Sequence, residues 1–447
     1  MTILNILFIL PEYLPHSGGG ISTYYQHYIT ALKPHVTKIK VIVGSGYVQS
    51  DDTFELDGVK VEYLKPILHQ KYLKCFSQYD LAPDFKANLA SAWAMWEQIQ
   101  NGDGYDLIEC TDFGLGFVPG IIQHQKPIVV RLHGSSGQIA LYENSLRNFG
   151  VSLYTSTELN LLARCDSLIT HSKANQQFWK EIFPNKKIEH FYPIYENLHP
   201  PVPFNQRNNV GLVTSRIQKW KGPITVCEAL SEMTNPPKIK WIGRDMDFSA
   251  QQSTAEYLRE HFPTIWKKQV VMEKPMPNAA VVSQQQQAKF GLIPSSWDMF
   301  NFTCLEFLSL GTPVVCSDGA GASELIKDGE NGFKFKANDK HSLIIALDKA
   351  NNLDQYTFSR ITAAGLEIVQ TQLSAATLLP LYLAHYQRLI ASFKPTTRNI
   401  LLEELYQPKD GMHKLDENLD KLPLKRLLYY IVKRISSKIG FFKISNL

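Results

Sequence analysis

Short apolar runs alternate with longer amphipathic segments along most of this chain, and that rhythm constrains the fold more than any other feature. The apolar runs that we predict to be strands in the first half are residues 3–10, 39–43, 59–64, 106–110, 128–132 and 167–170. The amphipathic segments between them predict helices at residues 21–32, 84–100, 157–164 and 174–183. Strands that alternate with helices form parallel sheets covered by helices on both faces, so the chain is predicted to be an α/β protein.

The rhythm stops at residues 192–209, where four prolines and a polar run indicate a linker. A second series of predicted strands follows at residues 211–214, 238–242, 270–273, 290–293 and 313–316. A chain of 447 residues also exceeds what one hydrophobic core usually serves. We therefore predict two doubly wound, Rossmann-like domains that face each other across a cleft.

The domain bounds follow from these breaks in the pattern. The first domain is predicted over residues 1–195 and the second over residues 196–375. Residues 376–393 are expected to form a helix that returns to the first domain, and residues 394–447 a C-terminal extension with a basic helical tail. In open α/β sheets ligands lie beyond the carboxyl ends of the strands, so functional residues should follow strands.

Composition excludes several classes of protein. The net charge of +4 is too small to indicate a nucleic-acid partner, and none is expected. Six scattered cysteines without a C-x-x-C pair indicate reduced thiols and a cytoplasmic location. The apolar N-terminal run lacks a basic leader and a cleavage site, so it is interpreted as a first strand and not as a signal peptide. No run is long enough to predict a membrane span.

The last 27 residues, 421–447, contain seven lysines or arginines and no acid. At helical spacing their apolar residues form one stripe, made of Leu424, Leu427, Leu428, Ile431, Ile435 and Ile439. One interpretation is a helix packed on the protein with solvated cations. The other, which we favour, is an interfacial helix attracted to anionic lipid, which would place the protein on the inner face of the plasma membrane.

Two cations open the second domain. In the stretch GLVTSRIQKWKG, Arg216 and Lys221 follow the strand predicted at residues 211–214. A guanidinium and an ammonium at this spacing suit a diphosphate, although isolated surface cations are common. The next residue, Gly222, would allow a ligand to approach the backbone closely and favours the functional interpretation.

Two acids lie in the stretch PSSWDMFNFTCLE, Asp298 before a predicted helix start near Thr303 and Glu306 inside the helix. Thr303 and Glu306 match a capping box, and Asp298 could be a solvated loop acid. However, the glycine-rich segment GAGASELIKDGENG brings a second helix start to the same sheet edge. Two helix N-termini offer free amides to an anion and favour a binding site.

Taken together, these motifs resemble the donor-binding half of the family-4 (GT4) retaining glycosyltransferases of GT-B fold. The pattern comprises RIQKWKG, then PSSWDMFNFTCLE, then GTPVV and GAGASE, in the family's order. The resemblance covers residues 1–393 and makes the first domain the acceptor side and the second the nucleotide-sugar side. Asp298 stands where the family has a glutamate, and Asn301 replaces its usual glycine.

The resemblance implies a role for each matched residue. Arg216 and Lys221 would neutralise the departing diphosphate, Glu306 would bind the ribose hydroxyls, and Asp298 would contact the sugar or stabilise positive charge at its anomeric carbon. Backbone amides that would hold the sugar and phosphate belong to Met299, Phe300, Asn301, Phe302 and Thr303.

The first domain is implied to contribute two further elements. His133 ends the strand in VVRLHGS, where the family's histidine meets the donor sugar. The glycine-rich segment PHSGGGIS, with Gly18, Gly19 and Gly20, resembles the family's first loop, whose amides approach the sugar or phosphate.

The predicted function is transfer of a sugar, with retention, from a nucleotide-diphosphate sugar to a hydroxyl of a saccharide or glycolipid in polysaccharide or glycoconjugate biosynthesis. No cofactor and no Asp-x-Asp metal site are expected, because Arg216 and Lys221 would replace the metal. Two alternatives are a sugar-nucleotide hydrolase or epimerase of the same fold, and a non-catalytic sugar-nucleotide-binding protein docked on membranes.

Overall fold

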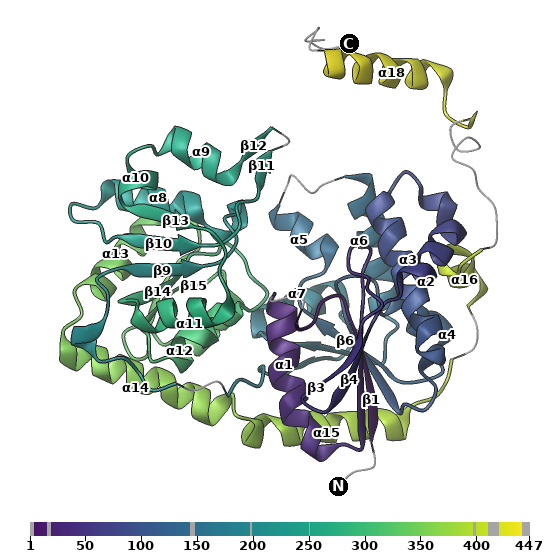
Figure 1. Cartoon of the computed structure of the whole chain (residues 1–447), viewed down its shortest axis with the longest axis horizontal. Coiled ribbons are helices and arrows are strands. Elements are labelled where there is room, and N and C mark those ends of the chain that lie inside the picture. The colour runs from purple at the N-terminus through teal and green to yellow at the C-terminus, as the bar shows by residue number, and fades with distance from the viewer. Residues whose placement is uncertain are drawn as a thin grey trace.

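The chain folds into two α/β domains, each with a mainly parallel sheet between layers of helices (Figure 1). The computed structural model describes residues 4–15, 19–143, 148–196, 199–249, 251–396, 399–409 and 420–439. The predicted fold class is therefore confirmed.

The first domain contains an eight-stranded sheet with the order β3-β4-β2-β1-β5-β6-β7-β8. All neighbours are parallel except the edge strand β3, which runs antiparallel to β4. The strands are β1 (Asn5–Leu10), β2 (Lys38–Val43), β3 (Thr53–Leu56), β4 (Val59–Tyr63), β5 (Leu107–Thr111), β6 (Ile128–Leu132), β7 (Ser167–Thr170) and β8 (Ile188–His190).

The second domain contains a six-stranded parallel sheet with the order β13-β10-β9-β14-β15-β16. These strands are β9 (Gly211–Thr214), β10 (Ile239–Ile242), β13 (Val270–Glu273), β14 (Phe290–Ile293), β15 (Val314–Ser317) and β16 (Phe333–Phe335). A separate hairpin pairs β11 (Asp247–Ser249) with β12 (Gln252–Ser253).

Each sheet has a point at which the strand order reverses. In the first sheet the chain builds outward from β1 on one side and from β5 on the other. In the second sheet the reversal lies between β9 and β14. Helices that cross over on opposite faces leave a crevice at such a point, outside the carboxyl ends of the strands. This geometry selects the segments after β1, β9 and β14 as the places for a ligand.

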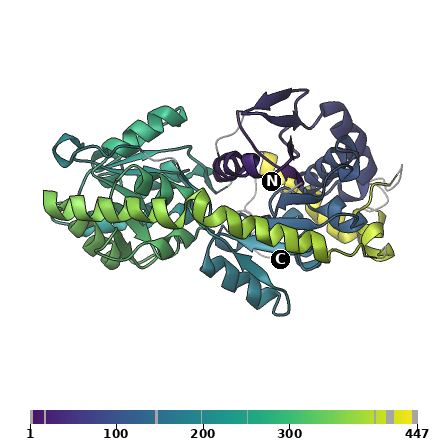
Figure 2. The same ribbon diagram turned by 90° about the horizontal axis from the view of Figure 1, so that it is seen from below.

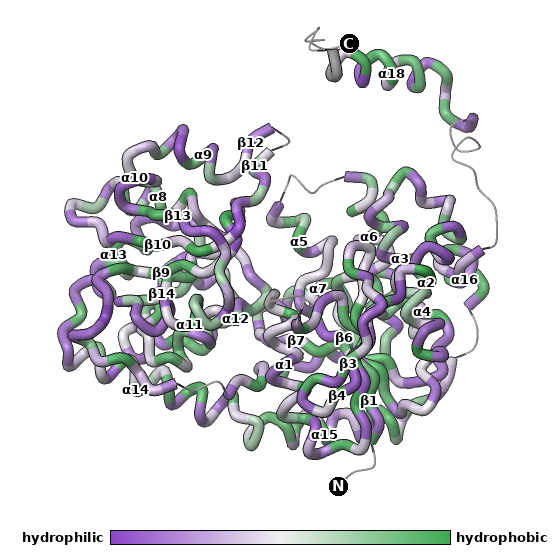
Figure 3. The backbone as a smooth tube through the Cα atoms, in the orientation of Figure 1, coloured by the Kyte–Doolittle hydropathy of each residue, from purple (hydrophilic) through white to green (hydrophobic). Residues whose placement is uncertain are grey.

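The central strands are buried on both faces, as a covered parallel sheet requires. Along β1, Ile6, Phe8 and Leu10 belong to one hydrophobic cluster and Leu7 and Ile9 to another. The first cluster continues into the second domain, and a third cluster covers the far face of the second sheet. Hydrophobic residues accordingly concentrate along the central strands (Figure 3).

The helices of the first domain are α1 (Gly20–Leu32), α2 (Pro66–Leu73), α3 (Pro83–Gln98), α4 (Val118–Gln123), α5 (Ser136–Tyr142), α6 (Phe149–Leu162) and α7 (Lys173–Ile182). Those of the second are α8 (Pro223–Glu232), α9 (Thr254–His261), α10 (Ile265–Lys268), α11 (Asn278–Gln287), α12 (Phe302–Ser309) and α13 (Lys340–Asn351). The helix predicted at 157–164 is the end of the longer α6, which begins after Asn148 caps its first turn.

Two long helices connect the domains (Figure 2). Helix α14 (Gln355–Gln372) runs along the second domain, and α15 (Ala375–Ser392) returns to the first. The hydroxyl of Tyr386 on α15 lies 2.6 Å from that of Tyr28 on α1. Tyr382 donates to the carbonyl of Tyr192 at 2.8 Å. These contacts attach α15 to the first domain.

A buried ion pair lies under α15. Arg131 on β6 donates to Glu109 on β5 through Nε at 2.6 Å and through Nη2 at 3.0 Å. Both side chains are fully buried, and the hydroxyls of Tyr25 and Tyr386 also donate to the Glu109 carboxylate. A bidentate pair with satisfied neighbours keeps two charges stable in the interior. It holds the carboxyl end of β6 in place.

The C-terminal extension contains two helices in the described part of the chain. Helix α16 (Ile400–Tyr406) packs on the first domain, where Trp93 Nε1 donates to the carbonyl of Tyr406 at 2.6 Å. Helix α18 (Leu424–Ile439) lies apart from both domains (Figure 1). Across the described residues, no helix combines the length and apolar character that a membrane span needs.

Candidate active site

Lys221 and Asp298 meet at the reversal point of the second sheet. Lys221 lies in the turn after β9, Asp298 lies in the loop after β14, and the Lys221 ammonium donates to Asp298 Oδ2. The side chains are only 12% and 14% exposed. Gly222 allows this approach, because it has a left-handed φ of 77° and a Cβ there would overlap the carbonyl oxygen of Pro294.

Backbone hydrogen bonds hold the Asp298 loop on the glycine-rich segment that follows β15. The Asp298 amide donates to Gly319 O at 2.9 Å, and the Gly321 amide donates to Asp298 O at 2.9 Å. Asn301, with a left-handed φ of 81°, donates from Nδ2 to Asp298 Oδ2 at 2.8 Å. The Asp298 carboxylate is therefore fixed by a cation, a side-chain amide and a backbone clamp.

Glu306 lies in α12, and its carboxylate faces β9 and α11. Gln285 Nε2 donates to Glu306 Oε2 at 2.6 Å and to Thr214 Oγ1 at 3.0 Å. Burial raises the pKa of Glu306, and the hydrogen bond from Gln285 opposes that shift. The capping-box interpretation is wrong, because α12 begins at Phe302 after Asn301 and has no side-chain cap. Thr303 instead donates to the carbonyl of Thr214 at 3.3 Å.

His133 follows β6 and faces the second domain from the first. The amides of His133 and Gly134 donate to the two carboxylate oxygens of Asp112 at 2.8 and 3.2 Å, which fixes the turn. The imidazole lies 6.5 Å, between ring centroids, from Phe302 of the second domain. His133 is therefore placed beside the start of α12.

The two domains meet at this loop. Ser172, after β7, donates from Oγ to the carbonyl of Met299 at 2.8 Å. The Lys173 amide donates to Glu324 Oε2 at 2.9 Å. Tyr142 of α5 stacks on Trp297, with centroids 4.5 Å apart and planes at 4°. The segment that carries Asp298 is thus enclosed by residues of both domains.

The remaining predicted site residues are distributed around this centre. Arg216 follows β9 but is exposed, and among the described residues it forms no ion pair. Gly19 precedes α1, Gly20 is its first residue, and Gly18 lies outside the described residues. The Phe300 carbonyl accepts from the Ala322 amide at 2.6 Å. The structure therefore brings Lys221, Asp298, Glu306 and His133 to one interdomain region and leaves Arg216 at its exposed border.

The sequence of this chain is similar to those of known glycosyltransferases. Residues 195–359 match the model of a family described as glycosyl transferases group 1. An uncharacterized glycosyltransferase of Methanocaldococcus jannaschii is 23% identical over 371 residues, covering 77% of this chain and 88% of the relative. A second one from that organism is 22% identical over 349 residues, covering 77% and 87%.

The chain is a glycosyltransferase of the GT-B fold.

Solved structures share the fold of this glycosyltransferase. Sucrose-phosphate synthase of Thermosynechococcus elongatus superposes with a TM-score of 0.66 at 17% identity, covering 87% of this chain and 100% of that one. HepE of Anabaena in complex with UDP-glucose gives 0.61 at 18% identity, covering 86% and 100%. The catalytic domain of Arabidopsis thaliana starch synthase IV, bound to ADP and acarbose, gives 0.66 at 13% identity, covering 87% and 100%.

The glycosyltransferase holds two neutral imidazoles on the first-domain side. Burial and the nearby Arg131 charge lower the pKa of His133 well below its ordinary value. Burial, with His133 and Arg131, likewise lowers the pKa of His171, whose ring lies 5.1 Å from that of His133. His171 Nδ1 donates to the carbonyl of Phe191 at 3.2 Å. Within the part of the chain that the structure describes, the Nε2 atoms of both histidines are buried without a hydrogen-bond partner, as expected of groups that await a polar ligand.

Three residues of this site were missed by the sequence analysis: His171, Asp112 and Gln285. His171 and Asp112 directly follow β7 and β5, so the rule that functional residues follow strands would have found them. Gln285 had no such signal, because it lies inside α11 within a run of four glutamines. Only the packing of α11 on α12 selects it.

An Asp-x-Asp triplet, Asp245-Met246-Asp247, also occurs in the chain, although no such metal site was expected. Asp245 Oδ1 accepts a hydrogen bond from the Ala255 amide at the start of α9, at 2.9 Å, and Asp247 is exposed on β11. Within the described ranges, no cluster of three or more His, Cys, Asp or Glu residues could hold a metal ion. The triplet serves the local turn in this structure.

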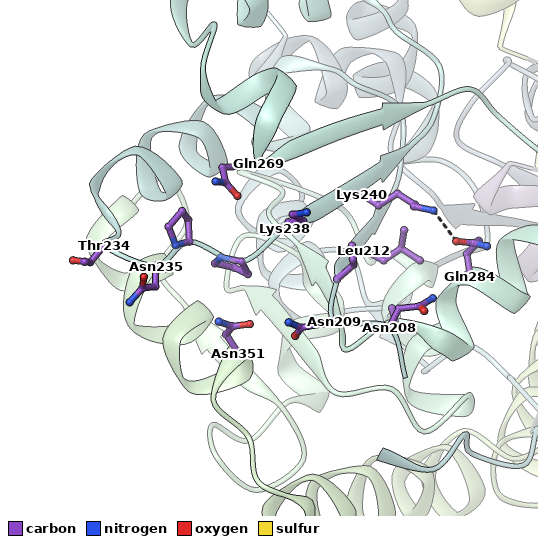
Figure 4. A pocket seen from close by; sticks show the side chains of 14 residues that line it. Asn208, Asn209, Leu212, Thr234, Asn235, Lys238, Lys240, Gln269, Gln284 and Asn351 are labelled. Carbon is purple, nitrogen blue, oxygen red and sulfur yellow. Dashed lines mark hydrogen bonds between the residues drawn. The ribbon is translucent and has the colours of Figure 1, made fainter. Parts of the chain in front are cut away.

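A hollow of about 950 Å³ lies at the opposite edge of the second sheet (Figure 4). Its lining includes Asn208, Asn209 and Lys238, which precede β9 and β10, and Lys240, which donates to Gln284 at 3.0 Å. These positions are at the amino ends of the strands, whereas ligands of open α/β sheets bind at the carboxyl ends. The hollow is therefore separate from the candidate active site.

Proposed function

We propose that this enzyme is a GT4-type retaining glycosyltransferase that moves a hexosyl group from a nucleotide-diphosphate sugar to a hydroxyl of a saccharide or glycolipid. One observation carries the proposal: Lys221 and Asp298 pair at the reversal point of the second sheet, with Glu306 one turn into the adjoining helix. Solved neighbours of the same fold that hold UDP-glucose or ADP support a nucleotide-sugar donor.

In this mechanism Lys221 stabilises the leaving diphosphate. An ammonium has three donors, so Lys221 can keep its bond to Asp298 and still donate to phosphate oxygens. A preorganised donor in a water-poor site lowers the barrier by stabilising the charge that develops on the leaving group. Arg216, exposed beside the turn, would add a second positive charge to the diphosphate. The proposed reaction needs no metal cofactor.

Glu306 and His133 would bind the two ends of the donor. The buried Glu306 carboxylate would accept hydrogen bonds from the ribose hydroxyls, with Gln285 holding its other side. His133 would meet the sugar through its unpaired Nε2. A neutral imidazole suits this place, because a second cation would oppose the positive charge that develops at the anomeric carbon. Asp298 would contact the sugar hydroxyls or stabilise that charge.

Retention follows if the acceptor hydroxyl attacks from the face that the diphosphate leaves. The acceptor would enter from the first domain, near the Tyr142–Trp297 stack. We place the reaction in polysaccharide or glycoconjugate biosynthesis, on the cytoplasmic side and at the inner face of the plasma membrane. The basic 421–447 segment and the six free cysteines support that location.

The first experiment is a thermal-shift screen of UDP-, GDP- and ADP-sugars. A ligand that binds only the folded protein at one hundred times its Kd adds about 2.7 kcal/mol of stability, so the true donor should raise Tm by several degrees. The Glu306→Ala variant should lose that shift. NMR of the product from the selected donor then reports the anomer, and an inverted product would contradict the mechanism. Product analysis with donor alone separates transfer from hydrolysis or epimerisation.

A further inference from the structure

Helix α18 presents an uncovered apolar face. Leu424, Leu428, Ile431 and Ile435 follow one another at helical spacing and are 78%, 62%, 51% and 52% exposed. The helix lies apart from both domains in Figure 1, and Figure 3 shows hydrophobic and hydrophilic residues alternating along it. A stripe of large aliphatic residues in water is unfavourable, so a partner that covers it would stabilise this segment.

The charges on α18 define the chemistry of that partner. At 3.6 residues per turn, Lys425 and Arg434 flank the apolar stripe, and Arg426 and Lys433 lie on the opposite face. No acid occurs anywhere in residues 421–447. The partner must therefore offer an apolar layer directly beside a negatively charged, hydrated one.

The length of α18 decides how it would lie on such a surface. Its 16 residues extend about 24 Å, less than the roughly 30 Å of a bilayer's hydrocarbon core. Five cations within that length also exclude a position across the core. A helix that lies in the plane of the headgroups accommodates both the cations and the apolar stripe, because lysine and arginine reach the phosphates while the aliphatic residues enter the acyl region.

We propose that α18 is a membrane-docking helix that lies in the headgroup layer of an anionic lipid bilayer. This inference deepens the location given under the proposed function and does not depend on the reaction, because binding to lipid requires neither donor nor acceptor. A second copy of this chain fits less well, since pairing two such helices would bring their cations together. Tyr429 and Tyr430, 55% and 58% exposed, are of the aromatic type that is enriched at membrane interfaces.

The test is co-sedimentation of the full chain with vesicles of phosphatidylcholine alone and of phosphatidylcholine mixed with phosphatidylglycerol. Binding is expected only to the anionic vesicles and should weaken as salt is raised. Ile431→Glu should reduce it at least tenfold, because it places a charge in the apolar stripe. The double substitution Arg426→Gln and Lys433→Gln should reduce it about twenty-five-fold, at about fivefold for each cation.

Ile67→Glu is the matched control, because it also replaces an exposed isoleucine by glutamate but lies outside α18. Ile67 is on α2 and is 75% exposed. This variant should bind vesicles like the unmodified chain, and a chain ending at Asp420 should not bind. Equal sedimentation with and without residues 421–447 would overturn the proposal. So would tail-dependent dimerisation, measured by light scattering, without vesicle binding, because the apolar face would then be covered by a second copy. The donor-induced thermal shift of the Ile431→Glu variant reports whether donor binding is intact. This measurement separates the test of membrane docking from that of the catalytic proposal.

Discussion

Replacing Lys221 by alanine tests the central contact of the proposed mechanism. The substitution removes the ammonium that bonds to Asp298 and leaves Asn301 as the remaining side-chain donor to that carboxylate. If Lys221 stabilises the leaving diphosphate, kcat should fall about 100- to 1,000-fold, which is the effect of removing one preorganised donor to a developing anion, about 2.7 to 4 kcal/mol.

Stability should change much less than activity. The pair is mostly buried, at 12% and 14% exposure. Leaving the Asp298 charge without its cationic partner should therefore lower the free energy of unfolding by about 1–3 kcal/mol. Water can reach the carboxylate through its exposed part, and the Asn301 bond remains, so the fold should survive. The additional removal of Asp298 in a Lys221→Ala, Asp298→Ala double variant should restore part of that stability.

The assay is release of nucleoside diphosphate from the donor selected by thermal shift, with calorimetric unfolding measured in parallel. Lys219→Ala is the matched control, because Lys219 lies in the same turn but is exposed, and the ion pair described for Asp298 is with Lys221. Its kcat should stay within threefold or so of the parent value, since exposed charges contribute little. If Lys221→Ala also retained kcat within that range, Lys221 would be only a structural partner of Asp298.

Three further predictions concern the surrounding residues. Glu306→Gln should weaken donor binding about 10- to 100-fold in calorimetric titration, because hydrogen bonds to a charged acceptor contribute about 1.5–3 kcal/mol; unchanged affinity would exclude the ribose contact. Burial, reinforced by the Glu158 carboxylate, raises the pKa of Asp112 to about 8. The unfolded chain therefore loses this proton first as pH rises, and stability should fall between about pH 4 and pH 8. Urea titrations at several pH values measure the free energy of unfolding, and Asp112→Asn should make its decrease with pH smaller. An unchanged dependence on pH would contradict this explanation. Gly222→Ala should lower Tm and activity together. Gly104 has the same φ of 77°, but nothing lies within 4 Å of a Cβ placed there. Gly104→Ala should therefore show only the strain of the left-handed backbone.

The sequence predicted the local elements well because strand and helix patterns depend on near neighbours. Strands β6, β7, β9, β13 and β14 have the predicted bounds, and others differ by one or two residues. The exceptions are the short β3, β8, β11, β12 and β16, which are too brief to show a period against the surrounding loops. The chemistry-bearing residues that follow β9, β14 and β6 were likewise predictable, since the carboxyl ends of parallel strands share one edge.

Contacts between distant segments were decided only by the tertiary structure. Glu306 does not cap its helix but contacts Gln285, which another helix brings within 2.6 Å. Arg216 is exposed while the Lys221–Asp298 pair is mostly buried, and this difference depends on how the turn after β9 bends. That bend requires Gly222 to pass Pro294, which follows β14. The neutral state of His133 and His171 is set by burial between the domains and by Arg131 beneath them. Periodicity along a chain records which face of an element is buried, but it does not record which side chain of another element lies against that face.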